Sequence, residues 1–531
     1  MNGRGDGVGW WQLAALWTLL MAVALGLRSF LPIDETRYVT VAWEMWLRGD
    51  FLVPHLNGQT YAHKPPLLFW LYQLGWWLFG VNDWWPRLVA PLFGLGSLVL
   101  TFSLARRLWP ERPEVAGLSV WLLFGSVYWA GYGTAAMFDM LVVFFALLGL
   151  LGLWRAGQGE GRMWLLVGLA IGLGILAKGP VILLHILPAA LLAPWWSRIA
   201  AAGKARWYLH LLGALLLGIA IALAWAVPAA LRGGDDYARA IFWGQTANRM
   251  VDSFAHRRAL WWYLPLLPLI FFPWFWWTPL WKGVRRLARQ GPDARVRFCL
   301  AWLVPGFVTL SLISGKQVHY LLPLFPAVAL LAARGFQESE TRQLRLRLPA
   351  VILVLFGLLV VSLPWWGVLP EWGAELQVQW ALLLVAAGLL LWWWRPADPR
   401  AAVRILAGAS VLIVISLHLV MQKPLAHAYD LRPVAREIAA LQAKGVPLVH
   451  ESKYAGEYHF LGRLREPLQV IHLGTLERWA REHPDGYIIY YLSRWQKALL
   501  PEGCHFWQYY RGQYVTLIPG HFYLDQILPA E

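Results

Sequence analysis

An acidic pair follows the first long apolar segment of the chain, residues 10–30. The stretch that comes next reads Leu31-Pro32-Ile33-Asp34-Glu35-Thr36-Arg37-Tyr38. Charged side chains at a membrane boundary cost free energy, so in a polytopic protein they mark candidate functional sites. A carboxylate there can act as a general base, orient an acceptor or stabilise positive charge in a transition state. We therefore predict that Asp34 and Glu35 are catalytic.

The charged residues of this stretch also allow simpler roles. Asp34 follows Pro32 and could cap a helix that begins at Glu35. Glu35 could pair with Arg37 or Lys64 and take no part in the chemistry. The cost of charges at a membrane boundary favours function for Asp34, whereas both roles of Glu35 stay open. We assign Arg37 to substrate binding.

A second polar group precedes a Pro-Pro step. It reads Tyr61-Ala62-His63-Lys64-Pro65-Pro66. Proline disfavours helical geometry in the residue before it, so Lys64 is expected at the start of an interfacial segment. A lysine there suits a lipid phosphate as a point charge, and an anchor that contacts only bulk headgroups is the alternative. We assign Lys64 to phosphate binding.

Asp139 heads an apolar segment and has no charged neighbour in the sequence. The segment begins Thr134-Ala135-Ala136-Met137-Phe138-Asp139-Met140. A lone aspartate at the entry to a membrane span is either functional or a helix cap. Its expected position on the same side as Asp34 favours function, so we predict that Asp139 is a second catalytic carboxylate.

A fourth group lies in a loop before an aromatic run. It reads Asn248-Arg249-Met250-Val251-Asp252-Ser253-Phe254-Ala255-His256-Arg257-Arg258. Arginine binds phosphate through paired hydrogen bonds, so Arg249 and Arg257 are predicted to bind substrate phosphate. His256 could bind a metal with His63 or Glu35, and a hydrogen-bonded interfacial histidine is an equal alternative.

A fifth group fills a short loop between two apolar segments. It reads Ser314-Gly315-Lys316-Gln317-Val318-His319-Tyr320. Lys316 lies on the side of the membrane where basic residues are otherwise scarce, so we assign Lys316 and Tyr320 to substrate binding. Lys178 is a further cation, before Gly179 and Pro180, and we favour a simple turn between two short spans for it.

The composition describes a protein with many membrane spans. Of 531 residues, 59% are hydrophobic and only 14% are charged, whereas soluble domains carry about 25% charged residues. The net charge of +16 does not indicate nucleic-acid binding, because the basic residues cluster in loops between apolar segments. This is the pattern that sets the orientation of a membrane protein and holds anionic lipid. The main clusters are Arg106, Arg107 and Arg112; Lys282, Arg285, Arg286, Arg289, Arg295 and Arg297; and Arg342, Arg345 and Arg347.

Apolar length predicts thirteen spans, with an uncleaved first span, the N-terminus inside and the C-terminus outside. The spans are 10–30, 86–105, 115–131, 140–154, 164–177, 180–195, 209–230, 261–281, 298–313, 320–334, 348–368, 378–394 and 402–420. Residues 66–81 are assigned to the interface, because a crossing there would place the basic loops on the side opposite an internal N-terminus. This topology gathers four polar stretches on the outer face: 31–64, 132–139, 232–260 and 314–319.

The chain changes character after residue 420. Residues 421–531 are more polar and predict a small α/β domain on the outer side, with helices near 432–443 and 475–483. Strands are expected near 446–450, 468–473, 486–492 and 513–518. The fold class is therefore an all-α polytopic membrane domain, residues 1–420 with an outer loop at 31–85, followed by an α/β domain. Cys299 and Cys504 are expected on opposite sides, so no internal disulfide is predicted.

Taken in order, the five groups resemble the lipid A aminoarabinose transferase family, and more broadly the C-type glycosyltransferases that include protein O-mannosyltransferases. The residues that carry the resemblance are Pro32 to Tyr38, His63-Lys64-Pro65, the apolar 66–81 followed by Arg87, Phe138-Asp139, His256-Arg257, and Gly315-Lys316 before Tyr320. The chain departs from this branch at His63, where the family has a glutamate. In the family that glutamate lies near a metal and the carrier phosphate, with a histidine that matches His256.

The resemblance implies an inverting transfer of a sugar from a polyprenyl phosphate, such as undecaprenyl phosphate, to a lipid or glycan acceptor such as lipid A. It implies a multi-pass protein of the bacterial inner membrane, a site and C-terminal domain on the periplasmic side, and a monomer without nucleic acid. No cofactor is required, and a divalent metal such as zinc would lie near His63 and His256. The alternatives are another polyprenyl-phosphate-sugar transferase that acts on protein or envelope glycan, a lipid or glycan transporter, and a non-catalytic lipid-binding assembly protein.

Overall fold

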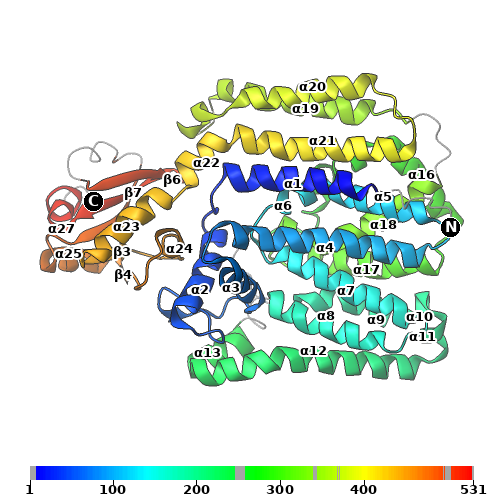
Figure 1. The fold of residues 1–531 in the computed structure, drawn as a ribbon, viewed down its shortest axis with the longest axis horizontal. Coiled ribbons are helices and arrows are strands. Elements are labelled where there is room, and N and C mark those ends of the chain that lie inside the picture. Colours follow the sequence, from blue (N-terminus) through cyan, green and yellow to red (C-terminus); the bar gives the residue numbers. More distant parts are fainter. Residues whose placement is uncertain are drawn as a thin grey trace.

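A helical bundle with a small β-sheet attached to one end makes up the molecule (Figure 1). The computed structural model describes residues 8–244, 257–338, 344–367, 369, 371–493, 496 and 504–528. The N-terminal end of the first helix and the C-terminal sheet lie at opposite ends of the bundle (Figure 1). Both cysteines, Cys299 and Cys504, are described and neither forms a disulfide.

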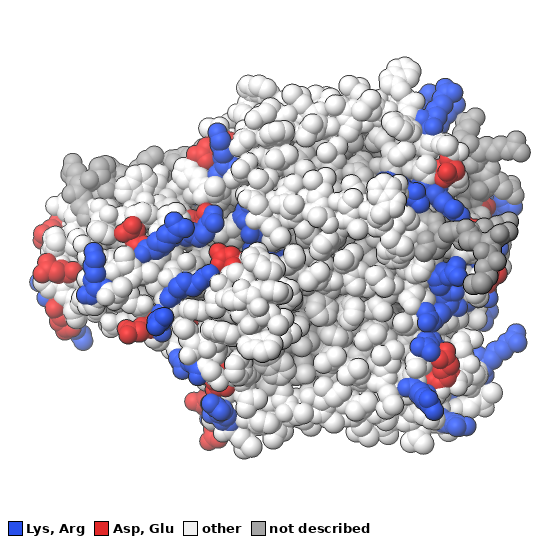
Figure 2. Space-filling model, in the orientation of Figure 1, with Lys and Arg blue, Asp and Glu red and all other residues white. Residues whose placement is uncertain are grey.

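Long apolar helices form the bundle. Among the described residues, eight helical segments are long and apolar enough to cross a membrane. They are α1 (Trp10–Leu27), α4 (Trp84–Leu108), α7 (Asp139–Ala156), α12 (Lys204–Gly233), α17 (Ala294–Leu312), η5 (Val318–Leu324) with α18 (Phe325–Gln337), α19 (Arg347–Ser362) with η6 (Leu363–Trp366), and α21 (Pro399–Val420). Charged side chains gather at the two ends of the molecule, with a broad uncharged band between them (Figure 2). This surface is what a membrane-spanning bundle requires.

Shorter apolar helices complete the bundle. They are α3 (Leu67–Phe79), α5 (Pro113–Phe124), α8 (Met163–Lys178), η1 (Pro180–Ile182) with α9 (Leu183–Leu191), and η8 (Val378–Ala381) with α20 (Leu382–Trp393). Short connecting helices are α6 (Val127–Tyr132), α10 (Ala193–Trp196), α11 (Arg198–Ala202), α13 (Asp235–Arg239), η2 (Ala240–Gly244) and η7 (Glu371–Glu375). Twelve of the thirteen predicted spans therefore coincide with apolar helical segments.

The predicted span at 261–281 is not a single helix. It consists of η3 (Leu264–Leu266), α15 (Leu267–Ile270), η4 (Trp274–Trp276) and the first residues of α16 (Thr278–Gln290). Four prolines interrupt it, at positions 265, 268, 273 and 279. Proline lacks the N–H that continues a helical ladder, so this largely apolar segment does not form a continuous helix.

Two helices at the sheet end of the bundle carry the first two polar groups. α2 (Asp34–Arg48) begins just after Pro32, and its chain reverses at Gly49, whose positive φ of 61° lets its N–H reach the carbonyls of Met45 and Trp46. The short hairpin of β1 (His55–Leu56) and β2 (Gln59–Thr60) then leads to α3. α3 packs beside α2 and begins directly after Pro66, so Lys64 lies just before it, as the Pro-Pro step predicted.

The C-terminal part folds as a five-stranded mixed sheet. Its strands are β3 (Leu448–Glu451), β4 (Gln469–Ile471), β5 (Tyr487–Ser493), β6 (Phe506–Tyr510) and β7 (Gln513–Pro519), in the order β4-β3-β5-β7-β6. The helices are α22 (Gln422–Tyr429), α23 (Arg432–Ala443), α24 (His459–Gly462), α25 (Leu473–Glu482), α27 (Gly520–Phe522) and η10 (Tyr523–Ile527). β3 runs parallel to β4 and β5, whereas β7 is antiparallel to β5 and β6. Both predicted helices and all four predicted strands are present, and β6 was missed.

The segment that carries α24 contacts α2. The Thr40 hydroxyl donates to the carbonyl of Gly456 at 2.7 Å, and the Trp43 indole donates to the carbonyl of Leu464 at 2.9 Å. The Phe460 ring packs edge-on against Phe30, with ring centroids 5.7 Å apart. The C-terminal part is therefore fixed against the helix that begins with Asp34.

Candidate active site

Asp34 is the first residue of α2 and is largely open to solvent. Its side chain is 56% exposed, and its Oδ1 lies 3.5 Å from both the Arg37 guanidinium and the Tyr38 hydroxyl. No described side chain caps α2, so the capping role considered for Asp34 is not seen. Burial raises the pKa of Tyr38, and the negative charges of Asp34 and Asp139 raise it further, so this hydroxyl stays protonated as a donor.

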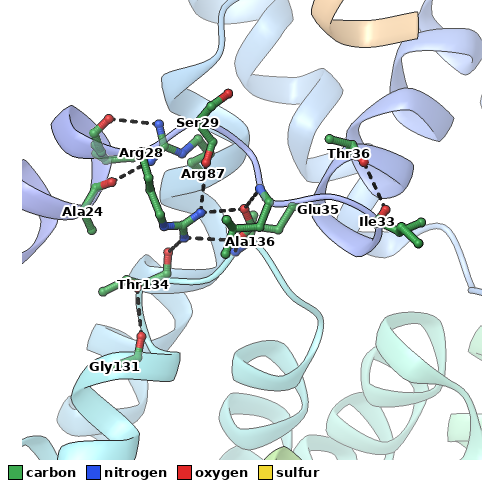
Figure 3. A network of polar contacts seen from close by, with 12 residues as sticks. Ala24, Arg28, Ser29, Ile33, Glu35, Thr36, Arg87, Gly131, Thr134 and Ala136 are labelled. Carbon is green, nitrogen blue, oxygen red and sulfur yellow. Dashed lines mark hydrogen bonds and ion pairs between the residues drawn. The ribbon is translucent and has the colours of Figure 1, made fainter. Parts of the chain in front are cut away.

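Glu35 has the opposite environment, at the centre of a buried network (Figure 3). Both of its oxygens accept from Arg28, at 2.7 and 3.2 Å, and they also accept from the backbone N–H groups of Leu31 and Ala136, each at 2.8 Å. Burial alone would raise the pKa of Glu35, but the Arg28 charge and these hydrogen bonds outweigh it and lower that pKa. Glu35 thus pairs with Arg28, not with Arg37 or Lys64 as considered from the sequence.

Two arginines fix the end of α1 beside this network. Arg87, from α4, donates to the carbonyls of Ala24 at 2.7 Å and Leu25 at 3.0 Å. The last carbonyls of a helix have no partner within it and carry partial negative charge, so a guanidinium is well suited there. Arg28 leaves α1 at this point and also donates to the carbonyl of Thr134 at 2.9 Å.

Asp139 is the first residue of α7 and is buried. Its Oδ1 lies 2.5 Å from the Lys178 ammonium, at the end of α8, and its Oδ2 accepts from the Tyr132 hydroxyl at 2.8 Å. The side chain of Asp139 is only 5% exposed and that of Lys178 15%. Lys178 therefore does more than mark a turn: it neutralises the predicted catalytic aspartate.

Phe138 connects the first three polar groups. Its ring packs edge-on against Tyr38, from α2, at 4.7 Å between centroids, and against Phe69, from α3, at 5.7 Å. The Lys64 ammonium lies 5.7 Å from the centroid of the same ring. Since Phe138 precedes Asp139, this aromatic cluster brings Lys64 and the start of α2 to the entry of α7.

The loops that carry the fourth and fifth polar groups also lie together. Arg257 and Gly315 form an antiparallel bridge, and the Arg258 N–H donates to the Ser314 carbonyl at 3.1 Å. Lys316 is a buried residue, and its ammonium donates to the carbonyls of Arg258, at 3.1 Å, and Ile313, at 2.6 Å. These bonds give Lys316 a structural task, which is to join the two loops.

The last loop closes the group around Asp139. The His319 ring stacks on Tyr132 at 5.3 Å, and the Lys178 ammonium lies 5.1 Å from the Tyr320 ring centroid. His319 lies in the electrostatic field of both carboxylates and both lysines, Asp34, Asp139, Lys64 and Lys178. Residues from four of the five polar groups therefore converge at one end of the bundle.

Two predicted site residues, Arg249 and His256, lie outside the described residues. His63 is exposed and packs edge-on against Tyr61, with ring centroids 5.3 Å apart. The described residues contain no group of three or more His, Cys, Asp or Glu that could hold a metal ion. His256 lies outside the described part of the chain, so the metal site predicted at His63 and His256 stays a prediction.

Four residues that were not predicted from the sequence complete the site: Arg28, Tyr132, Lys178 and His319. Lys178 carried a signal, because a lysine within apolar sequence needs a partner and Asp139 lacked one. Arg28 carried the same signal at the end of the first span. Tyr132 and His319 are polar aromatic residues in aromatic-rich sequence, and only the packing of the helices distinguishes them.

The arrangement can serve a reaction between charged, lipid-linked groups. An exposed carboxylate, a buried carboxylate neutralised by a lysine, and a lysine on an aromatic ring lie within one region. The fold and this site together define a polytopic helical membrane protein with a charged, aromatic-rich site at the end of its bundle that bears the sheet.

Comparison with known proteins specifies this class. Residues 63–229 match the family described as dolichyl-phosphate-mannose-protein mannosyltransferase. Undecaprenyl phosphate-alpha-4-amino-4-deoxy-L-arabinose arabinosyl transferase from Edwardsiella ictaluri is 34% identical over 380 residues, which cover 67% of this chain and 66% of the relative. The protein of the same name from Erwinia tasmaniensis is 32% identical over 67% of this chain and 64% of its own length. The sequence match thus spans slightly less than two thirds of these relatives.

The same fold occurs over nearly the whole chain in a solved structure. ArnT from Cupriavidus metallidurans in the apo state has a TM-score of 0.76 at 20% identity, and the match covers 97% of this chain and 98% of that one. Its structure bound to undecaprenyl phosphate has a TM-score of 0.74, over 96% and 98% of the two chains. The resemblance predicted from the sequence is confirmed, and the chain is related to glycosyltransferases that use a lipid-linked sugar donor.

Proposed function

We propose that the protein is an integral membrane glycosyltransferase that moves a sugar from undecaprenyl phosphate to an acceptor at the periplasmic face of the inner membrane. The observation that carries the proposal is the convergence of Asp34, Lys64, Asp139 and Lys178 around Phe138 and His319. Sugar transfer from a lipid carrier needs cations for the leaving phosphate and carboxylates for the acceptor and the developing positive charge. The relatives named above support the same reaction type.

In the proposed reaction an acceptor oxygen attacks the anomeric carbon of the sugar. The bond from that carbon to the carrier phosphate oxygen breaks, and its electrons leave with the phosphate. One displacement inverts the configuration at the anomeric carbon. Lys64 and Arg257, with Arg249, are assigned to the carrier phosphate, and Lys316 supports them by joining their loops.

The two carboxylates act on the sugar and the acceptor. Asp34, which is exposed at the start of α2, orients the acceptor or takes its proton. An acceptor phosphate is already an anion, so with lipid A Asp34 positions the group and no strong base is needed. Asp139 is held by Lys178 and Tyr132 and places fixed charge near the sugar.

The orientation and the substrates are part of the proposal. Basic residues such as Arg106 and Arg107 lie at the end of α4 far from the sheet, which supports a cytoplasmic position for that end and a periplasmic one for the site. We assign thirteen crossings, including the broken segment at 261–281, and α3 to the interface. The names of the relatives support aminoarabinose as the sugar; lipid A is the proposed acceptor and a monomer the proposed state.

The test is transfer by the purified protein in proteoliposomes that contain undecaprenyl-phosphate-linked aminoarabinose and lipid A. Mass spectrometry should detect lipid A with one added aminopentose, and Lys64→Ala should abolish the product while the protein still inserts. Lipid A and envelope glycans of a deletion strain should lack the same sugar. Transfer of a different sugar, or to protein, would point to another polyprenyl-phosphate-sugar transferase; full activity of both Asp34→Asn and Lys64→Ala would contradict the assignment.

A further inference from the structure

We infer that Arg28 and Glu35 form a positioning pair that sets the Asp34 end of α2 against the loop leading to Asp139, and that Glu35 does not touch the substrate. The inference deepens the proposed function, on which it rests, because it assigns a task to the residue beside Asp34. It replaces the catalytic role predicted for Glu35 from the sequence.

The contacts of Glu35 leave its carboxylate no capacity for a substrate. Oε2 accepts from the Arg28 Nη1 and the Leu31 N–H, and Oε1 accepts from the Arg28 Nη2 and the Ala136 N–H. A carboxylate offers about four lone-pair positions, and here four donors occupy them. The side chains of Glu35 and Arg28 are each only 4% exposed. An acceptor or a sugar would have to displace a partner to reach Glu35.

The pair joins two parts of the site that are distant in the sequence. Glu35 follows Asp34 directly, whereas Ala136, which donates to Glu35, comes 101 residues later and shortly before Asp139. Arg28 donates to the Thr134 carbonyl on the same loop. One ion pair therefore holds the backbone before Asp139 against the first turn of α2 (Figure 3).

The pair is itself attached to a rigid support. Arg87 holds the Ala24 and Leu25 carbonyls at the end of α1, only a few residues before Arg28. The Arg87 guanidinium also lies 5.8 Å from the Phe30 ring centroid. The position of Arg28 is thus fixed by α1 and α4. Through its contacts with Glu35 and Thr134, Arg28 in turn positions the segments that carry Asp34 and Asp139.

Buried ion pairs contribute little net stability, since desolvation offsets their attraction, so geometry is the stronger reason for this one. A displacement of about 1 Å in a reacting group can reduce turnover about 10²-fold. Loss of the pair should therefore act on turnover through Asp34 and Asp139. Donor affinity should change less, because Lys64 lies on a separate segment, before α3, and meets the 134–138 segment only through its contact with the Phe138 ring.

The test uses the full-length protein in proteoliposomes with Glu35→Gln, Arg28→Met and the double variant. Glu35→Gln leaves a buried guanidinium without its counterion, and kcat should fall roughly 30-fold or more. In the double variant no buried charge is left unpaired and the new amide oxygen can still accept from Ala136, so kcat should recover about tenfold over Glu35→Gln. The donor KM should stay within about threefold in all three variants.

Hydrogen exchange gives a readout that does not depend on activity. Backbone amides of residues 134–138 should exchange faster in Glu35→Gln than in the unaltered protein, because the Ala136 N–H loses its charged acceptor and Arg28, without its counterion, holds the Thr134 carbonyl less firmly. The matched control is Glu338→Gln at the opposite end of the bundle, where Glu338 accepts from Arg112, Arg334 and Gln290. That control should leave both exchange at 134–138 and kcat unchanged.

Two results would overturn the inference. A double variant as inactive as Glu35→Gln, although exchange at 134–138 has returned to that of the unaltered protein, would make the Glu35 carboxylate itself the chemical group. If hydrogen exchange at 134–138 is the same in Glu35→Gln and in the unaltered protein, the Arg28–Glu35 pair does not position this segment, whatever the activity. Absence of sugar transfer by the unaltered protein would instead contradict the proposed function, and the exchange measurement would still decide on the pair.

Discussion

The two candidate catalytic aspartates are held in opposite ways. Asp34 has a side chain that is 56% exposed, and its nearest partners are 3.5 Å away. Asp139 is 5% exposed, and an ammonium and a hydroxyl hold its two oxygens at 2.5 and 2.8 Å. Both residues start a helix, so the difference comes from their neighbours and not from local geometry.

The contrast separates two tasks within one site. A loosely held, exposed carboxylate can exchange its bound water for an acceptor. A buried carboxylate with fixed partners keeps its charge and position through the reaction, which is the property of preorganised electrostatic catalysis. Asp34 is thus suited to handle the acceptor, and Asp139 to provide fixed charge.

The sharpest test of this contrast compares the two asparagine variants. Asp34→Asn should reduce kcat about 10³-fold without changing the melting temperature, because the exposed carboxylate contributes to chemistry and not to folding. Asp139→Asn should reduce both, because it leaves Lys178 buried without a counterion. Sugar transfer and thermal unfolding in detergent measure the two effects. An equal loss of stability in both variants would contradict the division of tasks.

The ion pair of Asp139 can be broken from its other side. Lys178→Met should reduce kcat about 10²-fold and destabilise the protein by about 3 kcal/mol, because a buried carboxylate loses its partner. The double variant Lys178→Met/Asp139→Asn should recover most of the stability but none of the activity. If both recover in the double variant, Asp139 has a structural task only.

Glu35, the buried neighbour of Asp34, should make the thermal stability of the protein depend on pH in the acidic range. The lowered pKa of Glu35 means that its ion pair stabilises the fold above the ordinary value of 4.5 and that this contribution is lost as pH falls through the lower, folded-state pKa. Melting temperature should therefore fall on acidification below about pH 4.5, and Glu35→Gln should flatten that part of the curve and lie below the unaltered protein at neutral pH. Asp34→Asn is the matched control, because it leaves the Arg28–Glu35 pair intact and should keep that fall in melting temperature. A Glu35→Gln curve parallel to the original would exclude a folded-state shift at Glu35.

The sequence predicted the architecture well because its signals are local. Apolar length located the helices of the bundle, and the Pro-Pro step correctly placed Lys64 before α3. The prediction of one continuous span at 261–281 was wrong, because two local rules conflict there. Apolar composition favours a single span, whereas the prolines at 265, 268 and 273 divide the segment into short helices. β6 was missed although Arg511 and Gly512, both at positive φ, form a two-residue turn of the kind that joins hairpin strands.

The site could be predicted only in part because its partners are distant in the sequence. Asp34 and Asp139 were predicted from the cost of charges at a membrane boundary, and Lys64 from the Pro-Pro step that follows it. Pairings such as Asp139 with Lys178 depend on how α7 packs against α8, and no spacing rule encodes that contact. A charge in apolar sequence thus indicates that a partner exists but not which residue it is.

The smallest expected effect uses the two tyrosines that serve the two aspartates. Tyr132→Phe removes a 2.8 Å hydrogen bond to buried Asp139, and a bond to a charged group contributes about 1.5–3 kcal/mol, so kcat should fall about tenfold or more. Tyr38→Phe removes a 3.5 Å contact to exposed Asp34, where water can replace the hydroxyl, so the loss should stay within about threefold. Both variants keep the ring, so the packing of Tyr38 on Phe138 is retained. Initial rates of sugar transfer at saturating donor measure the two losses. A larger loss in Tyr38→Phe than in Tyr132→Phe would mean that Asp34, and not Asp139, is the firmly held carboxylate during turnover.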